Sequence, residues 1–358
     1  MTGVSQLKPQ TARCRCLQQS AFWVPSGLSK SRDYRDVAGL VALRCSAFGG
    51  TSRDESVMWP RPPESTRCFS SDNAPTSSSK VTTQAMFAVP SHLAGLSKCS
   101  ESLTTSDGCV IDVWELSVPL TAGYVSVWAS NFRQHYCSDA EIDDLRDGTG
   151  LSRAEYLTQL VFPDKSAAPG PGIRAGDFAE LLISDYVEHL LGYWVPRGKY
   201  AEKASRDESV KGVDILGLRL TTPQTPTPTD TLLAFEVKAQ CSGGKYAGRL
   251  QTAIDDSSKD YLRRAMTLNA TKRRLRQAGE HDRALMIQRF QNLSDHPYVY
   301  RSGAAAVLSD AAYDEVLLQK ATKVSEHQNA ASLELIVIRG KELMKLVHAL
   351  YERAAHEA

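Results

Sequence analysis

Glu236 and Lys238 lie two residues apart in the segment TLLAFEVKA, Thr231 to Ala239, which is otherwise largely apolar. In a β-strand, residues i and i+2 project from the same face, so the two charged side chains point the same way. A buried strand rarely carries two charges on one face unless they are paired or take part in chemistry. This segment is therefore the first candidate for a functional site.

A second acid can be placed opposite Glu236. The residues from Gly212 to Leu220 predict a strand, and the Pro-rich loop TTPQTPTPTDT separates it from TLLAFEVKA. If the two strands form an antiparallel hairpin centred near residue 225, Asp214 lies directly across from Glu236 on one face. Like charges at that distance repel unless a proton or a cation lies between them. The hairpin therefore predicts a metal site.

A third acid comes from the preceding segment, IRAGDFAELLISDYVEHLLGYWVP, whose apolar residues recur at helical spacing until Pro196. Asp177 and Glu180 lie three residues apart near its start. Favourable interaction with the helix dipole explains Asp177, whereas Glu180 could serve the dipole or add a carboxylate to the site.

These residue types fit phosphodiester hydrolysis. Mg²⁺ prefers oxygen ligands and keeps several waters, so Asp214 and Glu236 are its predicted ligands, with Glu180 as a third ligand or as the holder of a water. Mn²⁺ can substitute. Lys238, a compact cation with rotatable donors, would orient the attacking water and stabilise the transition state. Gln240, two residues further along the strand, is a candidate auxiliary residue.

The pattern of Glu180, Asp214 and Glu236-Val237-Lys238 resembles the PD-(D/E)XK nuclease superfamily, although Val213 stands where that superfamily has proline. The phrases NFRQHYC, GPGIRAGDFAELLISDYVE and FEVKAQ resemble the DUF1837 family, which includes the nuclease subunit of the Hachiman anti-phage defence system. The resemblance implies an α/β, restriction-endonuclease-like core with a central mixed sheet flanked by helices, and the Val237 carbonyl as a neutral metal ligand. It also implies cleavage of DNA and a helicase partner.

A basic stretch follows the candidate site. From Lys259 to Arg289 the chain has nine basic and three acidic residues. Such a run is usually a solvated surface, but beside a metal site it favours contact with the phosphate backbone. The predicted DNA-binding residues are Arg263, Arg264, Lys272, Arg273 and Arg274.

The rest of the chain divides by composition. Residues 1–85 are rich in Ser, Arg, Pro and Thr and predict a disordered extension, or sequence upstream of a start at Met86. Residues 86–165 predict a small N-terminal α+β subdomain, with a hairpin of Cys109–Pro119 and Gly123–Ser130. The Pro/Gly-rich segment Pro163–Gly172 predicts a linker. Residues 172–355 are expected to form the nuclease-like domain. Further expected elements are helices at Ala140–Arg146, Ser152–Val161, Leu250–Leu268 and Lys341–Arg353, and strands at Ala304–Leu308 and Leu333–Ile338.

Several classes of function find no support in the sequence. No apolar stretch approaches the length of a membrane span, and the N-terminus lacks a signal-peptide core, so we expect a cytoplasmic protein. The eight cysteines follow no disulfide or zinc pattern. No GxxxxGK[ST] phosphate loop occurs, so ATP hydrolysis would come from a partner ATPase.

Three alternatives stay open. The chain could be a restriction-type endonuclease with its own sequence specificity. It could be a degenerate nuclease fold that only binds DNA or a partner. Asp214, Glu236 and Lys238 could also form a plain cross-strand ion-pair network, but one lysine balances only one of the two acids. That imbalance favours the metal-dependent nuclease.

Overall fold

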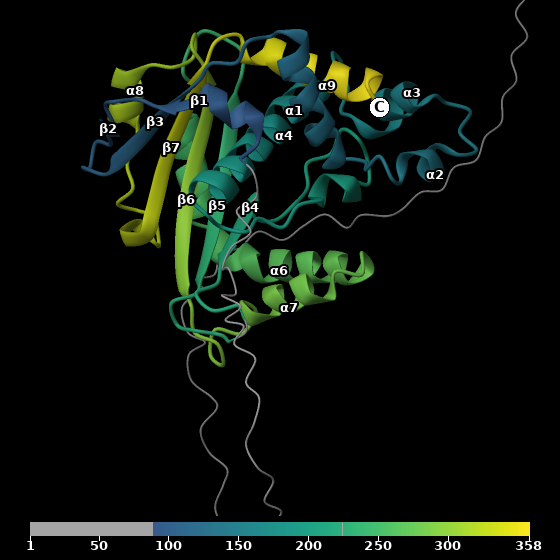
Figure 1. The fold of residues 1–358 in the computed structure, drawn as a ribbon. Coiled ribbons are helices and arrows are strands. Elements are labelled where there is room, and N and C mark those ends of the chain that lie inside the picture. Colours follow the sequence, from purple (N-terminus) through teal and green to yellow (C-terminus); the bar gives the residue numbers. More distant parts are fainter. Residues whose placement is uncertain (1–88, 224) are drawn as a thin grey trace, which may run out of the picture. The chain divides into compact units, whose positions relative to one another are not determined.

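The computed structural model describes residues 89–223 and 225–358, so the extension predicted for residues 1–85 lies outside the described part. The described residues form one mixed sheet, in which the strand order is β1-β3-β7-β6-β5-β4 and β2 pairs with β3 (Figure 1). The strands β3, β7, β6 and β5 run parallel, and β4 and β1 are antiparallel to their neighbours. The strands are β1 (Leu96–Lys98), β2 (Leu103–Thr104), β3 (Val110–Leu116), β4 (Ile215–Arg219), β5 (Thr231–Gln240), β6 (Val299–Ser309) and β7 (Leu333–Gly340).

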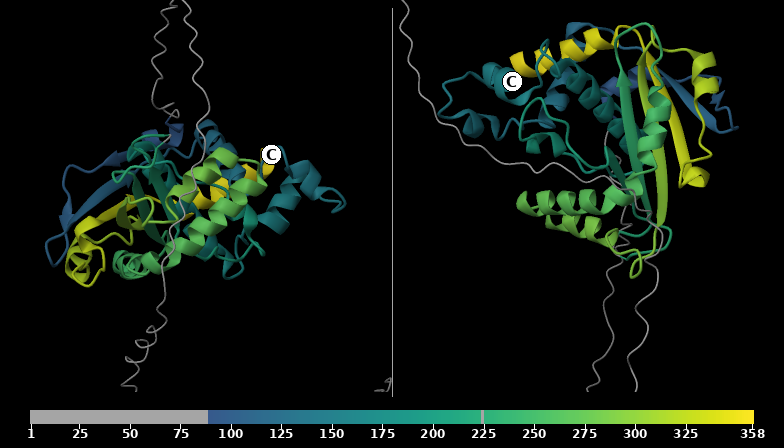
Figure 2. Two further views of the ribbon diagram at one scale, coloured as in Figure 1. Left: turned by 90° about the horizontal axis from the view of Figure 1, so that it is seen from below. Right: turned by 180° about the vertical axis from the view of Figure 1, so that it is seen from behind.

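Helices cover both faces of the sheet (Figure 2). One face packs against α1, α4 and α9 through a large apolar cluster, and the other packs against α5 and α8. The helices α6 and α7 pack beside each other over β4 and β5 through a third cluster. The helices are α1 (Ala122–Gln134), α2 (Ile142–Arg146), α3 (Arg153–Tyr156), α4 (Gly170–Asp185), α5 (Arg249–Ser257), α6 (Asp260–Gln277), α7 (His281–Arg289), α8 (Glu315–Ala321) and α9 (Leu343–His356). The expected α/β class, a central mixed sheet flanked by helices, is confirmed.

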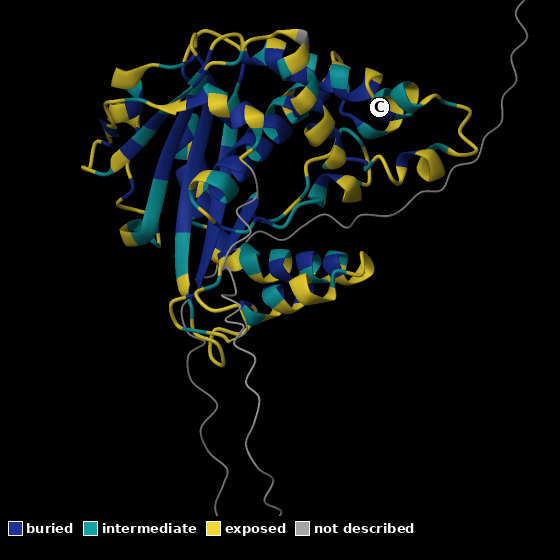
Figure 3. Ribbon diagram, viewed as in Figure 1, coloured by how far each residue is buried: buried dark blue, intermediate teal, exposed yellow. Residues whose placement is uncertain are grey.

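The strand β5 lies inside the sheet, between β4 and β6, and its residues from Thr231 to Val237 are buried (Figure 3). Phe235 and Val237 belong to the cluster shared with α4, whereas Leu232 and Ala234 belong to the cluster shared with α6. Because side chains alternate along a strand, Glu236 projects to the α6 side with these two residues.

The register of the hairpin follows the prediction. Ile215 pairs with Phe235 and Leu216 pairs with Ala234, which is the antiparallel alignment that sets Asp214 opposite Glu236. Asp214 itself immediately precedes β4. Gly212, just before it, has a φ of 122°, and a Cβ there would lie 2.6 Å from Thr267 Oγ1 of α6. Glycine therefore allows α6 to approach the start of the hairpin.

One predicted strand is a helix. The segment Gly123–Ser130 was expected to form a hairpin with Cys109–Pro119, but it lies within α1, and only the first segment forms a strand, β3. Val125, Trp128, Ala129 and Phe132 are buried at helical spacing against α4 and α9. The alternating reading was wrong because the buried residues continue beyond Ser130 with a period near 3.6 rather than 2.

The other expected elements differ mainly in their ends. Ser152 and Glu155 form the predicted capping box at the start of α3, which continues into a π-helical turn over Leu157–Val161. The helix expected over Leu250–Leu268 is divided into α5 and α6. The helix α4 begins at Gly170, inside the predicted linker, so Asp177 lies beyond its first turn and pairs with Lys203 instead of serving the helix N-terminus.

The boundaries proposed between residues 86–165 and 172–355 stay a prediction. Residues from both ranges, including Trp128 and Phe178, belong to one apolar cluster. The described cysteines, Cys99, Cys109, Cys137 and Cys241, are free thiols. Among the helices of the described residues, none has both the length and the apolar character of a membrane span.

Candidate active site at the β4–β5 hairpin

Asp214 and Glu236 are brought together by the hairpin. The backbone N–H of Val237 donates a hydrogen bond of 2.9 Å to Asp214 Oδ2, which fixes the Asp214 carboxylate beside the Glu236-Val237-Lys238 segment. Glu236 is buried, with 3% of its surface exposed. The sequence-based pairing of these two acids is therefore present as a contact between Asp214 and the backbone next to Glu236.

The charge environment of Asp214 is strongly acidic. Burial and the neighbouring carboxylate of Glu180 hold the pKa of Asp214 well above its usual range, and Glu236 raises it further. The cation of Lys199 and the hydrogen bond from Val237 offset this only in part. A buried carboxylate whose charged form is disfavoured in this way would be stabilised by a bound cation.

Glu180 reaches this group from α4 and is held by two residues of the following loop. Lys199 forms an ion pair with Glu180 and also donates a hydrogen bond of 2.6 Å to the Asp214 carbonyl oxygen. Tyr200 donates a hydrogen bond of 2.7 Å to Glu180 Oε2. Lys199 thus joins the helix carboxylate to the start of the hairpin.

Lys238 lies on the same side of β5 as Glu236 and donates to Glu236 Oε1 over 2.6 Å. Its ammonium group is also 3.1 Å from Asp256 Oδ2 on α5. Burial lowers the pKa of Lys238, but the hydrogen bond and charge of Glu236 outweigh burial, so the pKa is raised. The side chain is 24% exposed, so a charged donor at this position can be reached from solvent.

The second oxygen of Glu236 faces α6. Arg263 Nη2 lies 3.5 Å from Glu236 Oε2 and 3.0 Å from Asp260 Oδ1. Asp260 is fully buried, and neither of its carboxylate oxygens accepts a hydrogen bond from any described residue. Burial, followed by the charge of Glu236, raises the pKa of Asp260 to about 8.

The five predicted DNA-binding residues all lie on α6, but they differ in surroundings. Arg263 points to Glu236, and Arg264 stacks over the rings of Tyr261 and Tyr300. Lys272 contacts Gln291, and Arg274 forms an ion pair of 3.2 Å with Glu202. Arg273 is exposed. DNA contact by these residues stays a prediction.

Gln240 is engaged by the turn that follows β5. Its amide nitrogen donates a hydrogen bond of 2.6 Å to the Lys245 carbonyl, and its amide oxygen accepts one of 3.0 Å from the Ala247 N–H. Both ends of the amide therefore order the segment that leads to α5. The auxiliary catalytic role predicted for Gln240 stays untested.

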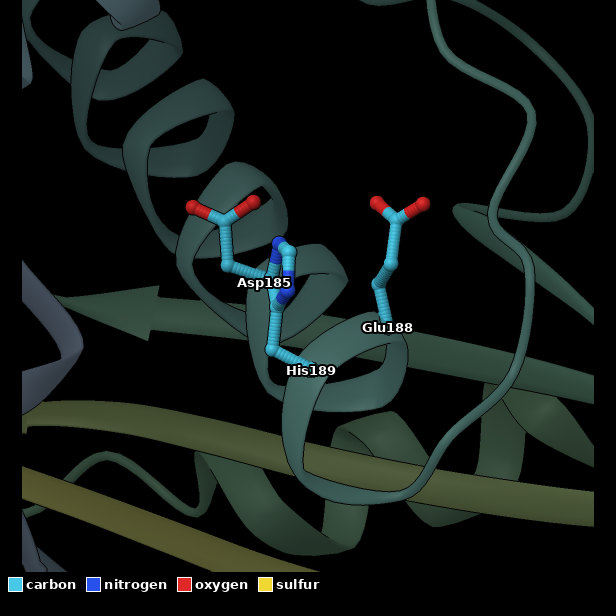
Figure 4. Close-up of side chains that lie close together, drawn as sticks. All are labelled: Asp185, Glu188 and His189. Atoms are coloured by element: carbon cyan, nitrogen blue, oxygen red, sulfur yellow. The ribbon is translucent and has the colours of Figure 1, made fainter. Parts of the chain in front are cut away.

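A second acidic group lies at the end of α4. Asp185, Glu188 and His189 place one potential ligand atom each within 4.8 Å of one another (Figure 4). Among the described residues, Glu180, Asp214 and Glu236 do not form a group this tight. Arg197, however, contacts Asp185 Oδ1 at 2.7 Å and Glu188 Oε2 at 2.5 Å. His92 contacts Asp185 Oδ2 at 2.8 Å.

These partners satisfy the second group. Burial raises the pKa of Asp185, but the hydrogen bond from His92 and the charge of Arg197 outweigh it, so the pKa is lowered. The carboxylate is stable in its charged form without any further cation. We therefore interpret Asp185, Glu188 and Arg197 as a structural ion-pair network.

The hairpin group fits a divalent metal ion better. Its donors are carboxylate oxygens, which Mg²⁺ prefers, and both burial and the neighbouring acids Glu180 and Glu236 raise the pKa of Asp214. A carboxylate has about four acceptor positions, so Glu236 can keep its contacts with Lys238 and Arg263 while one oxygen binds an ion.

A family model named HamA matches residues 96–354, which span all the elements of this site. The chain belongs to the HamA family. HamA proteins take part in the Hachiman defence system together with partner proteins, so the chain is a defence-related protein. A search of the curated proteins finds no match to the chain.

The sequence did not single out three contributors to this HamA site. Lys199 and Tyr200 lie in the charged loop KYAEKASRDESVK between α4 and β4. Asp260 was counted only as an acid within the basic stretch. Asp256 and Asp260, however, are four residues apart in the helical region directly after the candidate strand, which is a signal that they could face it together.

Proposed function

We propose that this HamA-family chain is a metal-dependent deoxyribonuclease that hydrolyses phosphodiester bonds of DNA during anti-phage defence. The observation that carries the proposal is the position of Asp214 beside Glu180 and Glu236: burial and the charges of these two acids hold its pKa well above the usual range, and the charged donor Lys238 lies next to Glu236. Glu180 and Glu236 each contact a cation, but the Asp214 carboxylate has no ion pair among the described residues, whereas Arg197 contacts both Asp185 and Glu188.

Asp214, Glu236 and Glu180 are the residues that would hold Mg²⁺ or Mn²⁺, which when bound supplies a Lewis acid next to the scissile phosphate. Lys238 acts as the chain's own electrostatic donor. Its ammonium group, fixed by Glu236 and Asp256, can donate to the attacking water or to a phosphate oxygen on which charge develops. Hydrolysis adds water across one P–O bond and leaves a phosphate monoester and a hydroxyl group.

Lys199 supports this arrangement through contacts within the protein. It bridges Glu180 and the Asp214 carbonyl, so it fixes the helix carboxylate relative to the hairpin. Tyr200 restrains the same carboxylate. A site held from two elements in this way is preorganised, which reduces the reorganisation needed when charge develops.

DNA is the proposed substrate because α6, which packs beside the site, carries most of the basic stretch. A partner helicase with ATPase activity is proposed from membership of the HamA family. One observation favours a second candidate, a fold that binds DNA without cleaving it: Lys238 and Arg263 contact one oxygen of Glu236 each. Binding without cleavage requires that this ion-pair arrangement persists when Mg²⁺ is present.

Degradation of linear and plasmid DNA by the purified full chain, with Mg²⁺, with Mn²⁺ and with EDTA, tests the proposal. We expect degradation that needs the metal and is lost in Glu236→Ala. DNA binding with equal stability in the presence and absence of Mg²⁺, and no degradation, would favour the binding fold. Discrete plasmid fragments instead of a smear would indicate a restriction-type enzyme.

A further inference from the structure

Arg263 differs from the other basic residues of α6 in what its guanidinium group contacts. Nη2 lies 3.5 Å from Glu236 Oε2, 3.0 Å from Asp260 Oδ1 and 2.5 Å from the Asp256 carbonyl oxygen. One side chain thus joins α6, α5 and β5 at the candidate active site.

The contact with Glu236 completes the restraint of that carboxylate. Lys238 donates to Oε1 at 2.6 Å, and Arg263 lies on the Oε2 side. Glu236 is 3% exposed, so these two cations, with the strand, define its orientation. A metal-ligating carboxylate that is oriented by neighbours binds and reacts better than one that rotates freely.

The Asp256 carbonyl oxygen directs Arg263 toward the interior, since it accepts a hydrogen bond of 2.5 Å from Nη2. Asp260 lies beside the same nitrogen, with its Oδ1 at 3.0 Å and its side chain fully buried. Burial and the charge of Glu236 raise the pKa of Asp260 to about 8, so this acid is largely protonated at neutral pH and does not hold Arg263 by its charge.

The contrast with Arg273 is direct. Arg273 lies on the same helix and is exposed, whereas the Arg263 side chain is 30% exposed and directed at Glu236. Both side chains carry the same charge, so they differ in position alone. A residue that only contacts the DNA backbone has no need of contacts with Glu236 and the Asp256 carbonyl oxygen.

We propose that Arg263 is a positioning residue for phosphodiester cleavage, which acts by orienting Glu236 and is itself held by the Asp256 carbonyl oxygen. The inference rests on the proposed nuclease function and changes the role that the sequence suggested for Arg263, a phosphate-backbone contact. It predicts that Arg263 affects the rate at saturating DNA rather than the affinity for DNA.

Single-turnover cleavage and DNA affinity, measured separately with the full chain, distinguish the two roles. We expect Arg263→Ala to lower the saturated cleavage rate about 10- to 100-fold while the Kd for DNA changes less than about threefold. Arg263→Lys should restore part of the rate, because it keeps the charge but loses the planar fork. Arg273→Ala should weaken the affinity, as expected for a backbone contact. Lys320→Ala, at an exposed residue of α8, is the control and should change neither the rate nor the Kd.

A higher Kd with an unchanged saturated rate in Arg263→Ala would overturn the proposal, since it is the behaviour of a backbone contact. If Arg263→Ala does not fold, as judged by circular dichroism, Arg263→Gln takes its place. A folded Arg263→Gln chain, which loses the charge at this position, should also lose rate at unchanged affinity, and an unchanged rate would overturn the proposal. A wild-type chain that cleaves no DNA with Mg²⁺ overturns the nuclease function as well, whereas cleavage unaffected by Arg263→Ala overturns this inference alone.

Discussion

Two acidic groups lie close to α4, one at the β4–β5 hairpin and one around Arg197. They differ in how their buried negative charge is compensated. The Arg197 group is the tighter one, with the potential ligand atoms of Asp185, Glu188 and His189 within 4.8 Å of one another. Its cations lower the pKa of Asp185, whereas at the hairpin the pKa of Asp214 is raised by burial, Glu180 and Glu236. On the proposed function, proximity of acids is therefore a weaker sign of a metal site than a buried acid without a cation partner.

Metal binding gives the largest expected difference between the two groups. Glu236→Gln should weaken Mn²⁺ binding by more than about 100-fold, because the excess charge and one ligand are removed together. Glu188→Gln should leave Mn²⁺ affinity within about threefold, since Arg197 already serves that carboxylate. Isothermal titration calorimetry measures both, and loss of Mn²⁺ binding in Glu188→Gln alone would reverse the comparison.

Folding stability should show the opposite ranking. Arg197 is largely buried and contacts Asp185 and Glu188, so Arg197→Ala leaves two acids without their cation. We expect the free energy of unfolding to fall by about 3 kcal/mol, measured by denaturant titration. Lys238→Ala, at the hairpin, should cost less and is the control. Equal losses in the two variants would mean that both groups are structural.

A smaller change in the free energy of unfolding is expected from the pH dependence of the Arg197 group. Burial and the charge of Arg197 lower the pKa of His135 to about 4, below the usual value of 6.5. As the pH falls below 6.5, the unfolded chain takes up this proton first, so the folded state loses stability between about pH 6.5 and 4. We expect His135→Gln to lose about 2 kcal/mol less than the wild type between pH 7 and 4.5. An identical loss in both chains would contradict the assignment to His135.

The smallest expected effect concerns the basic surface. Arg273→Ala should reduce the slope of log Kd against log salt concentration by about 1, which corresponds to one phosphate contact. Arg219→Ala is the control and should leave the slope unaltered. Arg219 is an exposed residue of β4 whose guanidinium stacks on Tyr193. Fluorescence anisotropy with labelled DNA measures the slopes. A slope changed equally by both variants would remove α6 as the specific DNA surface.

The hairpin and its acids could be predicted from sequence because the information is local. Alternation in TLLAFEVKA and the Pro-rich loop set the register, and the register placed Asp214 opposite Glu236. Glu180 followed from helical spacing and from resemblance to a family. A local pattern was enough wherever one element or one tight connection decides the geometry.

The remaining features depend on contacts between distant segments. Gly123–Ser130 alternates over a few residues, and only the packing of Val125, Trp128 and Phe132 against α4 and α9 distinguishes a helix from a strand. Lys199 reaches Glu180 from a loop whose path no local pattern fixes. The inward position of Arg263, which contacts Glu236 and the Asp256 carbonyl oxygen, becomes visible only when α6 is placed against β5.

The central claim, that the hairpin is a nuclease site and the Arg197 group is not, is tested most directly by cleavage with Lys238→Ala. The full chain, the Lys238→Ala variant and the exposed neighbour control Lys245→Ala are compared on linear DNA with Mg²⁺ at equal folded concentration. We expect Lys238→Ala to cleave at least about 100-fold more slowly, as for loss of one transition-state donor, and Lys245→Ala to cleave at the wild-type rate. Cleavage by folded Lys238→Ala at the wild-type rate would contradict the account.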